Sequence, residues 1–236
     1  NDPIFNQGRE IVLEEYLEGR EWDADIVMQG GRMLYHSVTD NWPTREPYFL
    51  ATGSSLPSRR LSAAEQAESV SLSERTLGAL GLADGVFHVE GKATSKGPRI
   101  LEVNVRPGGV YVVQWNETVN GVNLAEMLFL TAADIPAAPY KPAAPLTHLE
   151  GEFLIPGLSG RLERLEVEGR DRHPGFHELL TIKQVGSTVS VPPNGYDRVG
   201  MLVARGDSSE EAVRHLGELK AGLTMEISPP AATAKR

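Results

Sequence analysis

The chain has 236 residues, of which 40% are hydrophobic and 23% charged, an ordinary composition for a globular protein of one large or two modest domains. Its formal net charge is −9 and it holds no long run of Lys and Arg, so a nucleic-acid partner is not expected. The lack of cysteine excludes disulfides and thiolate metal sites. No apolar run is long enough for a membrane span and the start has no signal-peptide pattern, so the cytoplasm is the default expectation.

The first predicted strands follow a loop-like stretch at the start of the chain. Residues 10–17 read as a strand, and residues 21–40 read as a hairpin that turns at Gly30-Gly31, because glycines favour the positive φ angles of tight turns. Acidic and apolar residues alternate in the first strand of this hairpin. One face therefore carries Glu21, Asp23 and Asp25, and the other carries Trp22, Ala24, Ile26 and Met28.

A loop and a helix are predicted next. Residues 41–58 are rich in Pro, Gly and Ser and read as a loop with one short strand. Ser62 is a suitable N-cap for a helix over 62–82, with Glu65 three residues further on. The apolar stripe expected on this helix consists of Ala67, Val70, Leu77 and Leu80.

Residues 85–106 read as a second hairpin, and residues 122–135 read as an apolar helix. A connector rich in Pro and Ala, residues 136–145, suggests a boundary between two units. Beyond it we expect strands over 148–169 and 198–206 and a capped amphipathic helix over 208–223. The predicted organisation is α+β, with units at 1–135 and 149–227, a linker at 136–148 and a flexible tail at 228–236.

The stretch RILEVNVRPGG, which begins at Arg99, carries the most informative pattern. Period-2 alternation predicts that Leu101, Val103 and Val105 face a core, while the opposite face carries Glu102, Asn104 and Arg106. The pair Gly108-Gly109 follows directly, which suits a backbone that passes close to a ligand. A solvated polar face is the alternative explanation for this alternation.

A three-residue turn at 95–97 would pair positions whose numbers sum to 192, which brings Glu90 opposite Glu102 and His88 opposite Asn104. Two ionised carboxylates in such a pair repel each other. Either one carboxyl keeps its proton, or a divalent cation lies between them. Carboxylate and amide oxygens suit Mg²⁺ or Mn²⁺, and Arg106 at the rim suits a phosphoryl group.

These residues resemble the metal-binding end of the ATP-grasp ligases, where an acid on one strand precedes an E-x-N-x-R motif on the next. The resemblance implies that Glu90 and Glu102 bridge the metal, that Asn104 is a further ligand, and that Arg106 is the catalytic, oxyanion-stabilising arginine. It also implies the ATP-grasp large subdomain, an antiparallel sheet with flanking helices, followed by a smaller C-terminal α+β subdomain.

The run VLEEYLEGRE resembles the hinge of the same family. By that resemblance, Glu14, Glu15 and Leu17 line the adenine edge and Glu21 holds the ribose hydroxyls. The cofactors implied are ATP and Mg²⁺ or Mn²⁺. The family's N-terminal and lid subdomains, with the lysines that grip the phosphates, have no counterpart in this chain, so we expect a C-terminal half whose other half lies in the same or another chain.

The overall pattern over 10–227 is most similar to the L-amino acid ligase and carnosine synthase branch. That branch commonly has an acid and a histidine around E-T-G-H, whereas this chain reads Ala51-Thr52-Gly53-Ser54. The change argues against a simple zwitterionic amino acid as the carboxyl donor and favours an amine-masked acid in natural-product peptide synthesis. We expect Ser54, Gly108 and Gly109 to bind substrate.

The implied activity is ADP-forming ligation of a small carboxylate to an amine or amino acid through an acyl phosphate. A non-catalytic ATP-grasp remnant and a biotin-carboxylase-like enzyme are the alternatives. A homodimer is among the assemblies left open, and no nucleic acid or membrane partner is expected.

Overall fold

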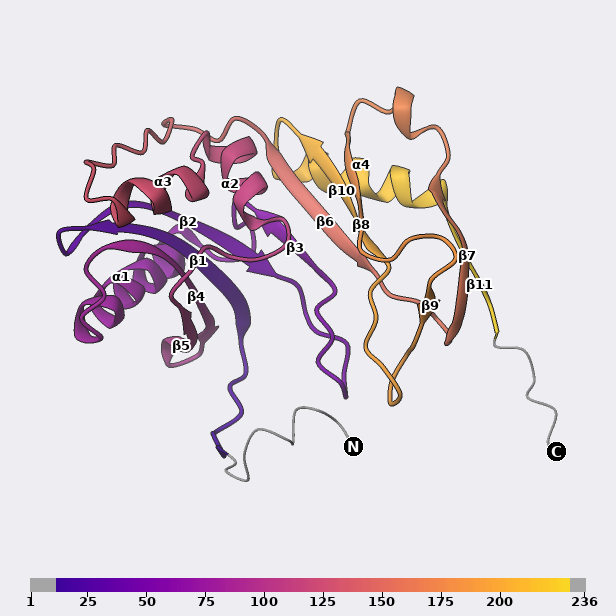
Figure 1. The fold of residues 1–236 in the computed structure, drawn as a ribbon, viewed down its shortest axis with the longest axis horizontal. Coiled ribbons are helices and arrows are strands. Elements are labelled where there is room, and N and C mark those ends of the chain that lie inside the picture. Colours follow the sequence, from indigo (N-terminus) through magenta and orange to yellow (C-terminus); the bar gives the residue numbers. More distant parts are fainter. Residues whose placement is uncertain (1–11, 230–236) are drawn as a thin grey trace.

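The computed structural model describes residues 12–229. Its main feature is a large sheet of strand order β5-β4-β1-β2-β3-β6-β10-β8, and a smaller sheet of order β11-β7-β9 lies at the other end of the molecule (Figure 1). The strands are β1 Arg20–Gln29, β2 Arg32–Asn41, β3 Gly53–Leu56, β4 Gly85–Thr94, β5 Gly97–Asn104, β6 His148–Leu154, β7 Gly160–Val167, β8 Phe176–Thr181, β9 Thr188–Val189, β10 Gly200–Gly206 and β11 Leu223–Ser228. The helices are α1 Ala63–Ala79, α2 Val112–Asn120, α3 Leu124–Ala132 and α4 Ser209–Ala221, with a 3-10 turn at Arg170–Arg172. The antiparallel sheet with flanking helices confirms the predicted fold class.

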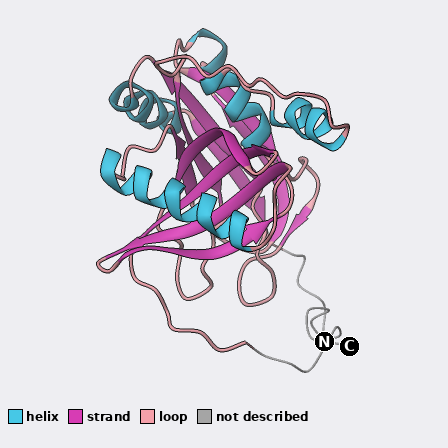
Figure 2. Cartoon of the chain, turned by 90° about the vertical axis from the view of Figure 1, so that its left-hand side faces the viewer, coloured by secondary structure: helices cyan, strands magenta, loops and turns pink. Residues whose placement is uncertain are grey.

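Helices cover both faces of the large sheet, as Figure 2 shows. The apolar side chains of β1, from Trp22 to Met28, pack with Val70 and Leu77 of α1. On the opposite face, α2 and α3 bury a second core around Trp115. The predicted alternation along β1 is confirmed, and its acidic residues share the face that α2 covers in part.

The first hairpin forms as predicted. Gly30 and Gly31 have φ angles of 58° and 71°, which are the left-handed values that a two-residue turn requires. Helix α1 begins after its N-cap Ser62, whose side chain forms a reciprocal capping box with Glu65. The predicted apolar stripe of α1 is partly wrong, because Ala67 and Leu80 are exposed and the buried line runs through Ser69 and Ser73.

The second hairpin confirms the predicted pairing at its base but not at its tip. Glu90 lies opposite Glu102, and His88 lies opposite Asn104. Nearer the tip, Gly91 pairs with Ile100, because the turn has two residues rather than three. Leu101 is the extra residue of a β-bulge, which restores the register that the shorter turn would have shifted.

Strand β5 lies at the edge of the sheet, and this overturns the expectation that its apolar face is buried. Leu101 is 47% exposed and Val105 is 67% exposed, and Val103 is half-buried. An edge strand has a neighbouring strand on one side only, so its side chains lack the cover that a second neighbour gives, although α1 packs against β5. Apolar alternation therefore does not guarantee burial there.

Two segments near the ends of the first unit differ from the prediction. Residues 12–17 form no strand, and their side chains are mostly exposed because no neighbouring strand pairs with them in the described region; residues 10 and 11 lie outside it. Helix α2, rich in β-branched residues and Asn, was not predicted. The predicted apolar helix is α3, capped by the Asn123 side chain, but Phe129 on it is 75% exposed.

The segments on the two sides of the connector share one sheet, because β3 pairs with β6. The predicted strands β6 and β7 form but do not pair with each other, since β7 belongs to the small sheet. The predictions of β10 and α4 are confirmed, whereas β8, β9 and β11 were not predicted. The domain boundary at 136–148 stays a prediction, and most of the predicted tail lies outside the described residues. Among residues 12–229, none of the helices has the length and apolar character to cross a bilayer.

Candidate functional site

The base of the β4–β5 hairpin gathers four of the predicted site residues. The Asn104 amide nitrogen donates to Glu90 Oε1 at 3.4 Å, and Arg106 Nη2 donates to Asn104 Oδ1 at 3.2 Å. Arg106 Nη1 also donates to the carbonyl of Pro107 at 2.9 Å. Glu102 is the cross-strand neighbour of Glu90. Hydrogen bonds thus link the Arg106 guanidinium, the Asn104 amide and the Glu90 carboxyl group along one sheet edge, and Glu102 lies across from Glu90.

The electrostatics of Glu90 favour a nearby cation. Burial raises the pKa of Glu90 above its ordinary value, His88 opposes that effect, and Glu102 and Glu21 add to it. A positive ion between the two carboxyl groups would relieve the repulsion. Among the described residues no three His, Asp or Glu side chains surround a common metal position. Glu90, Glu102 and Asn104 would therefore hold Mg²⁺ or Mn²⁺ only together with ligand oxygens, as is usual when phosphates complete the shell.

A buried polar network lies beside this edge, on the same face of the sheet. His88 Nδ1 lies 2.8 Å from Asp25 Oδ1, and its Nε2 lies 3.7 Å from both Asp23 Oδ2 and Glu90 Oε1. Burial disfavours the charged form of His88, but the hydrogen bond to Asp25 and the surrounding carboxyl groups outweigh it and raise the His88 pKa to about 9. Burial raises the pKa of Asp23 to about 8, with His88 opposing and Glu90 adding to the shift.

Helix α2 completes the network from above. The Asn116 amide nitrogen donates to Asp25 Oδ2 at 3.3 Å, and the Tyr35 hydroxyl donates to Asn116 Oδ1 at 2.6 Å. Both oxygens of Asp25 are therefore occupied, although the residue is fully buried. The sequence reasoning missed Asn116, because it missed α2.

The predicted substrate residues occupy different environments. Ser54 is buried, and its hydroxyl contacts the Tyr111 hydroxyl and Asn41, which in turn donates to Asp23 at 2.7 Å. Gly108 is buried, and Gly109 is exposed. A Cβ at Gly108 would come within 2.7 Å of His88 Nδ1, so only glycine fits there. Ser54 and Gly108 thus adjoin the buried network.

The predicted hinge residues are only partly brought together. Glu21 lines a polar cavity of about 160 Å³ with Lys92, whose ammonium lies 3.9 Å from the Glu21 carboxylate. The carbonyl of Leu17 accepts a hydrogen bond from the same ammonium at 3.2 Å. Glu14 and Glu15 are exposed and do not line this cavity. Lys92 was not singled out in the sequence, where it is one more polar residue in a strand.

Two family models match the chain. The ATP-grasp domain matches residues 3–114, and the L-amino acid ligase C-terminal domain 2 matches residues 152–228. The chain is 34% identical to human carnosine synthase 1 over 222 residues, which covers 93% of this chain and 26% of that protein. It is 41% identical to the chicken (Gallus gallus) protein of the same name over 157 residues, 66% of this chain and 17% of that protein.

Solved structures share the fold at low identity. The L-amino acid ligase from Bacillus licheniformis superposes with a TM-score of 0.79 at 18% identity, over 90% of this chain and 53% of that one. Phosphoribosylglycinamide synthetase from Anaerococcus prevotii gives a TM-score of 0.77 at 14% identity, over 91% and 55%. The chain therefore spans about a quarter of the length of human carnosine synthase and about half the length of these enzymes.

Proposed function

This chain belongs to the ATP-grasp family, and from that membership we propose that it supplies the metal-binding and phosphate-facing part of an ATP-dependent carboxylate–amine ligase. One observation carries the proposal. Glu90 and Glu102 are cross-strand partners, Asn104 donates a hydrogen bond to Glu90, and Arg106 donates one to Asn104. A scaffold that only filled space would gain nothing from opposing two acids at an open edge.

The proposed reaction has two steps. A carboxylate oxygen attacks the γ-phosphorus of ATP, the bond to the bridging oxygen breaks, and ADP leaves with the electron pair. An amine then attacks the carbonyl carbon of the acyl phosphate, and the tetrahedral intermediate expels inorganic phosphate as the nitrogen loses a proton. A divalent cation held by Glu90, Glu102 and Asn104 would neutralise charge on the triphosphate.

Arg106 is the proposed catalytic residue. Its guanidinium is exposed and is held by Asn104 and by the carbonyl of Pro107. These two contacts orient a cation at the rim, where the oxyanion of the tetrahedral intermediate would form. Preorganised charge at that position stabilises the transition state without the cost of reorienting water.

The proposed nucleotide contacts extend from the metal site toward β1. Glu21, at the polar cavity, would accept hydrogen bonds from the ribose hydroxyls, and the backbone of 14–17 would follow the adenine edge. Lys92 joins these two parts, because its ammonium contacts both Glu21 and the Leu17 carbonyl. Glu14, Glu15 and Leu17 would therefore act through their backbone groups.

The proposed carboxyl donor is an acid without a free α-amine. The side of the site near Ser54 offers hydroxyl and amide groups from Tyr111 and Asn41, and the one carboxyl group in that cluster, Asp23, accepts a hydrogen bond from Asn41 and has its pKa raised to about 8 by burial, which favours its uncharged form. A positively charged amine would thus find no free carboxylate partner there. Gly108 and Gly109 would let the substrate approach the backbone.

The test is an ADP-release assay on the complete protein with matched carboxylates, each as the free amino acid and as its N-acetyl form, paired with a panel of amines. We expect ADP formation with N-acetylated acids, and an amide of the summed mass in mass spectrometry. ADP release that needs bicarbonate instead of an amine would favour the carboxylase alternative. Nucleotide binding without turnover for every pair would favour the non-catalytic alternative.

A further inference from the structure

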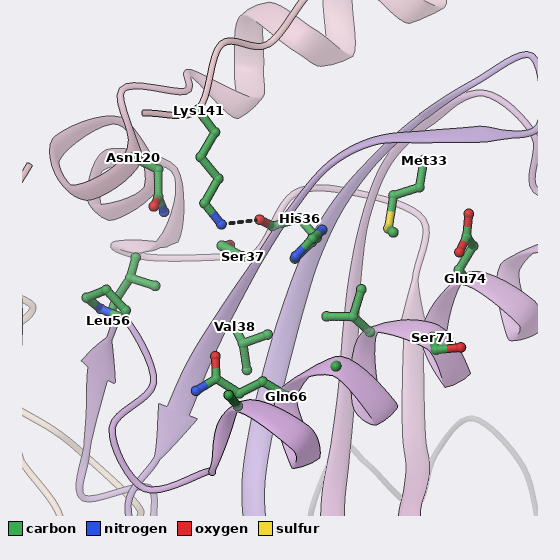
Figure 3. A pocket seen from close by; sticks show the side chains of 14 residues that line it. Met33, His36, Ser37, Val38, Leu56, Gln66, Ser71, Glu74, Asn120 and Lys141 are labelled. Atoms are coloured by element: carbon green, nitrogen blue, oxygen red, sulfur yellow. Dashed lines mark hydrogen bonds between the residues drawn. The ribbon is translucent and has the colours of Figure 1, made fainter. Parts of the chain in front are cut away.

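A second cavity, of about 490 Å³, lies away from the candidate ligase site (Figure 3). Strand β2 pairs with β3 only at Asp40 and Asn41. The stretch from Met33 to Val38 therefore has no strand neighbour on that side within the described region. The cavity opens along this edge, between α1 and the connector that follows α3.

Three hydrogen-bond donors gather at one end of the cavity, where Figure 3 shows Lys141, Asn120 and Ser37. Ser37 is 2% exposed and Asn120 is 4% exposed. The Ser37 hydroxyl and the Asn120 amide nitrogen lie beside the Tyr35 hydroxyl, but neither forms a hydrogen bond of good geometry with a described residue. The neighbouring Tyr35 hydroxyl gives its proton to Asn116. Buried polar groups without a partner are costly, so this end of the cavity is built for an acceptor.

The charge at this end is positive. The Lys141 ammonium donates to the His36 carbonyl at 3.0 Å and lies 5.6 Å from the Tyr35 ring centre. Burial lowers the pKa of Lys141, and no carboxylate among the lining residues adjoins it. Glu74 lines the opposite end of the cavity (Figure 3). His36 adds no charge at neutral pH, because burial and Lys141 lower its pKa.

The remainder of the wall is largely apolar. Val38, Leu56 and Val70 are buried and line the cavity between its two ends. An apolar wall of this kind binds hydrocarbon, and the polar groups at its ends set the orientation of a ligand and limit its length.

We propose that this cavity is a second small-molecule site, which binds an organic carboxylate with a short apolar body, the carboxylate resting on Lys141, Asn120 and Ser37. The site shares no lining residue with Glu90, Glu102, Asn104 and Arg106, so it does not depend on the proposed ligase activity. A charge-assisted hydrogen bond from Lys141 would supply much of the affinity.

The test is a titration of the ¹⁵N-labelled full chain with sodium hexanoate, followed by NMR. Hexan-1-ol, which has the same tail without the charge, is the matched probe. We expect saturable shifts in the amides of 33–38 and in the Asn120 side chain, with a dissociation constant in the range of about 1 mM. Hexan-1-ol should bind on the order of tenfold more weakly. Equal binding of the two probes, or no saturable shift with hexanoate, would overturn the proposal.

Two variants locate the site. Lys141→Gln should weaken hexanoate binding on the order of tenfold, whereas Lys96→Gln in the exposed β4–β5 turn should leave it unchanged. Ala67 is exposed on α1 and lines the cavity, so Ala67→Phe should fill the space, abolish binding and leave the fold intact. Unchanged affinity in either Lys141→Gln or Ala67→Phe would place the bound hexanoate elsewhere.

Discussion

Two polar clusters on the same face of the large sheet are organised in opposite ways. Both carboxylate oxygens of Asp25 have a donor, and the Asp25 side chain is fully buried beneath Asn116 of α2. In the second cluster Glu102 and Arg106 are exposed, and Glu102 faces Glu90 without a hydrogen bond to its own carboxylate among the described residues. Satisfied groups contribute to stability, whereas unsatisfied ones keep their capacity to bind a ligand. Mutations in the two clusters should therefore separate stability from activity.

The largest expected effect is the loss of stability when Asp25, which bonds to both His88 and Asn116 in the buried cluster, is replaced. Asp25→Ala leaves His88 and Asn116 without their shared partner, and breaking a buried pair on one side typically costs about 3–5 kcal/mol. The free energy of unfolding, from urea denaturation followed by circular dichroism, should fall by that amount. Glu68→Ala on the exposed side of α1 is the control. A loss below about 1 kcal/mol, the range of surface substitutions, would show that the network is not structural.

The next largest effect is expected on rate alone. Arg106→Ala in the complete protein should lower amide formation on the order of a hundredfold, because an oxyanion contact is lost, while ATP still binds. Arg99→Ala, an exposed arginine on strand β5 just before Arg106, is the matched control. The melting temperature of both variants should stay unchanged. Near-normal ligation by Arg106→Ala would remove this residue from the mechanism.

The two adjacent glycines allow an internally controlled comparison. A Cβ at Gly108 would lie 2.6 Å from Val112 Cγ1, whereas a Cβ at Gly109 would meet nothing within 4 Å. Gly108→Ala should therefore lower the free energy of unfolding by about 1–3 kcal/mol, a typical cost of overpacking. Gly109→Ala should leave it unchanged in the same denaturation experiment. Equal stability of the two variants would mean that the backbone at 108 moves freely.

The smallest expected effect on stability belongs to Glu102→Gln. Removal of a like charge opposite Glu90 should raise the free energy of unfolding by roughly 0.2–1 kcal/mol. At the same time, calorimetry on the complete protein should find that nucleotide binding no longer depends on magnesium. Glu163→Gln on the distant strand β7 serves as the control. Unchanged magnesium dependence would contradict the proposed metal site.

The hairpin that carries the site illustrates what can be predicted from local pattern. The register of Glu90 with Glu102 is confirmed, yet the turn on which it was argued has two residues instead of three. The bulge at Leu101 compensates for the missing turn residue. Alternation predicts which side chains share a face, but it does not reveal an inserted residue, because a bulge leaves no strong mark in composition.

The buried cluster was harder to foresee. Alternation placed Asp23 and Asp25 on the face of Glu21, and the structure confirms this arrangement. Whether such a face is covered depends on long-range packing, here of α2, whose β-branched sequence gives a weak helix signal. The exposed Leu101 and Val105 show the converse error, since an edge position cannot be inferred from a single strand.

Strand β3, before the proline-rich connector, pairs with β6, after it, so dividing the chain at the connector would separate two paired strands. Cleavage there would strip each product of a hydrogen-bonded strand partner and uncover apolar side chains such as Leu149. Bare edges of this kind template intermolecular pairing, so separately expressed halves should precipitate rather than behave as autonomous modules.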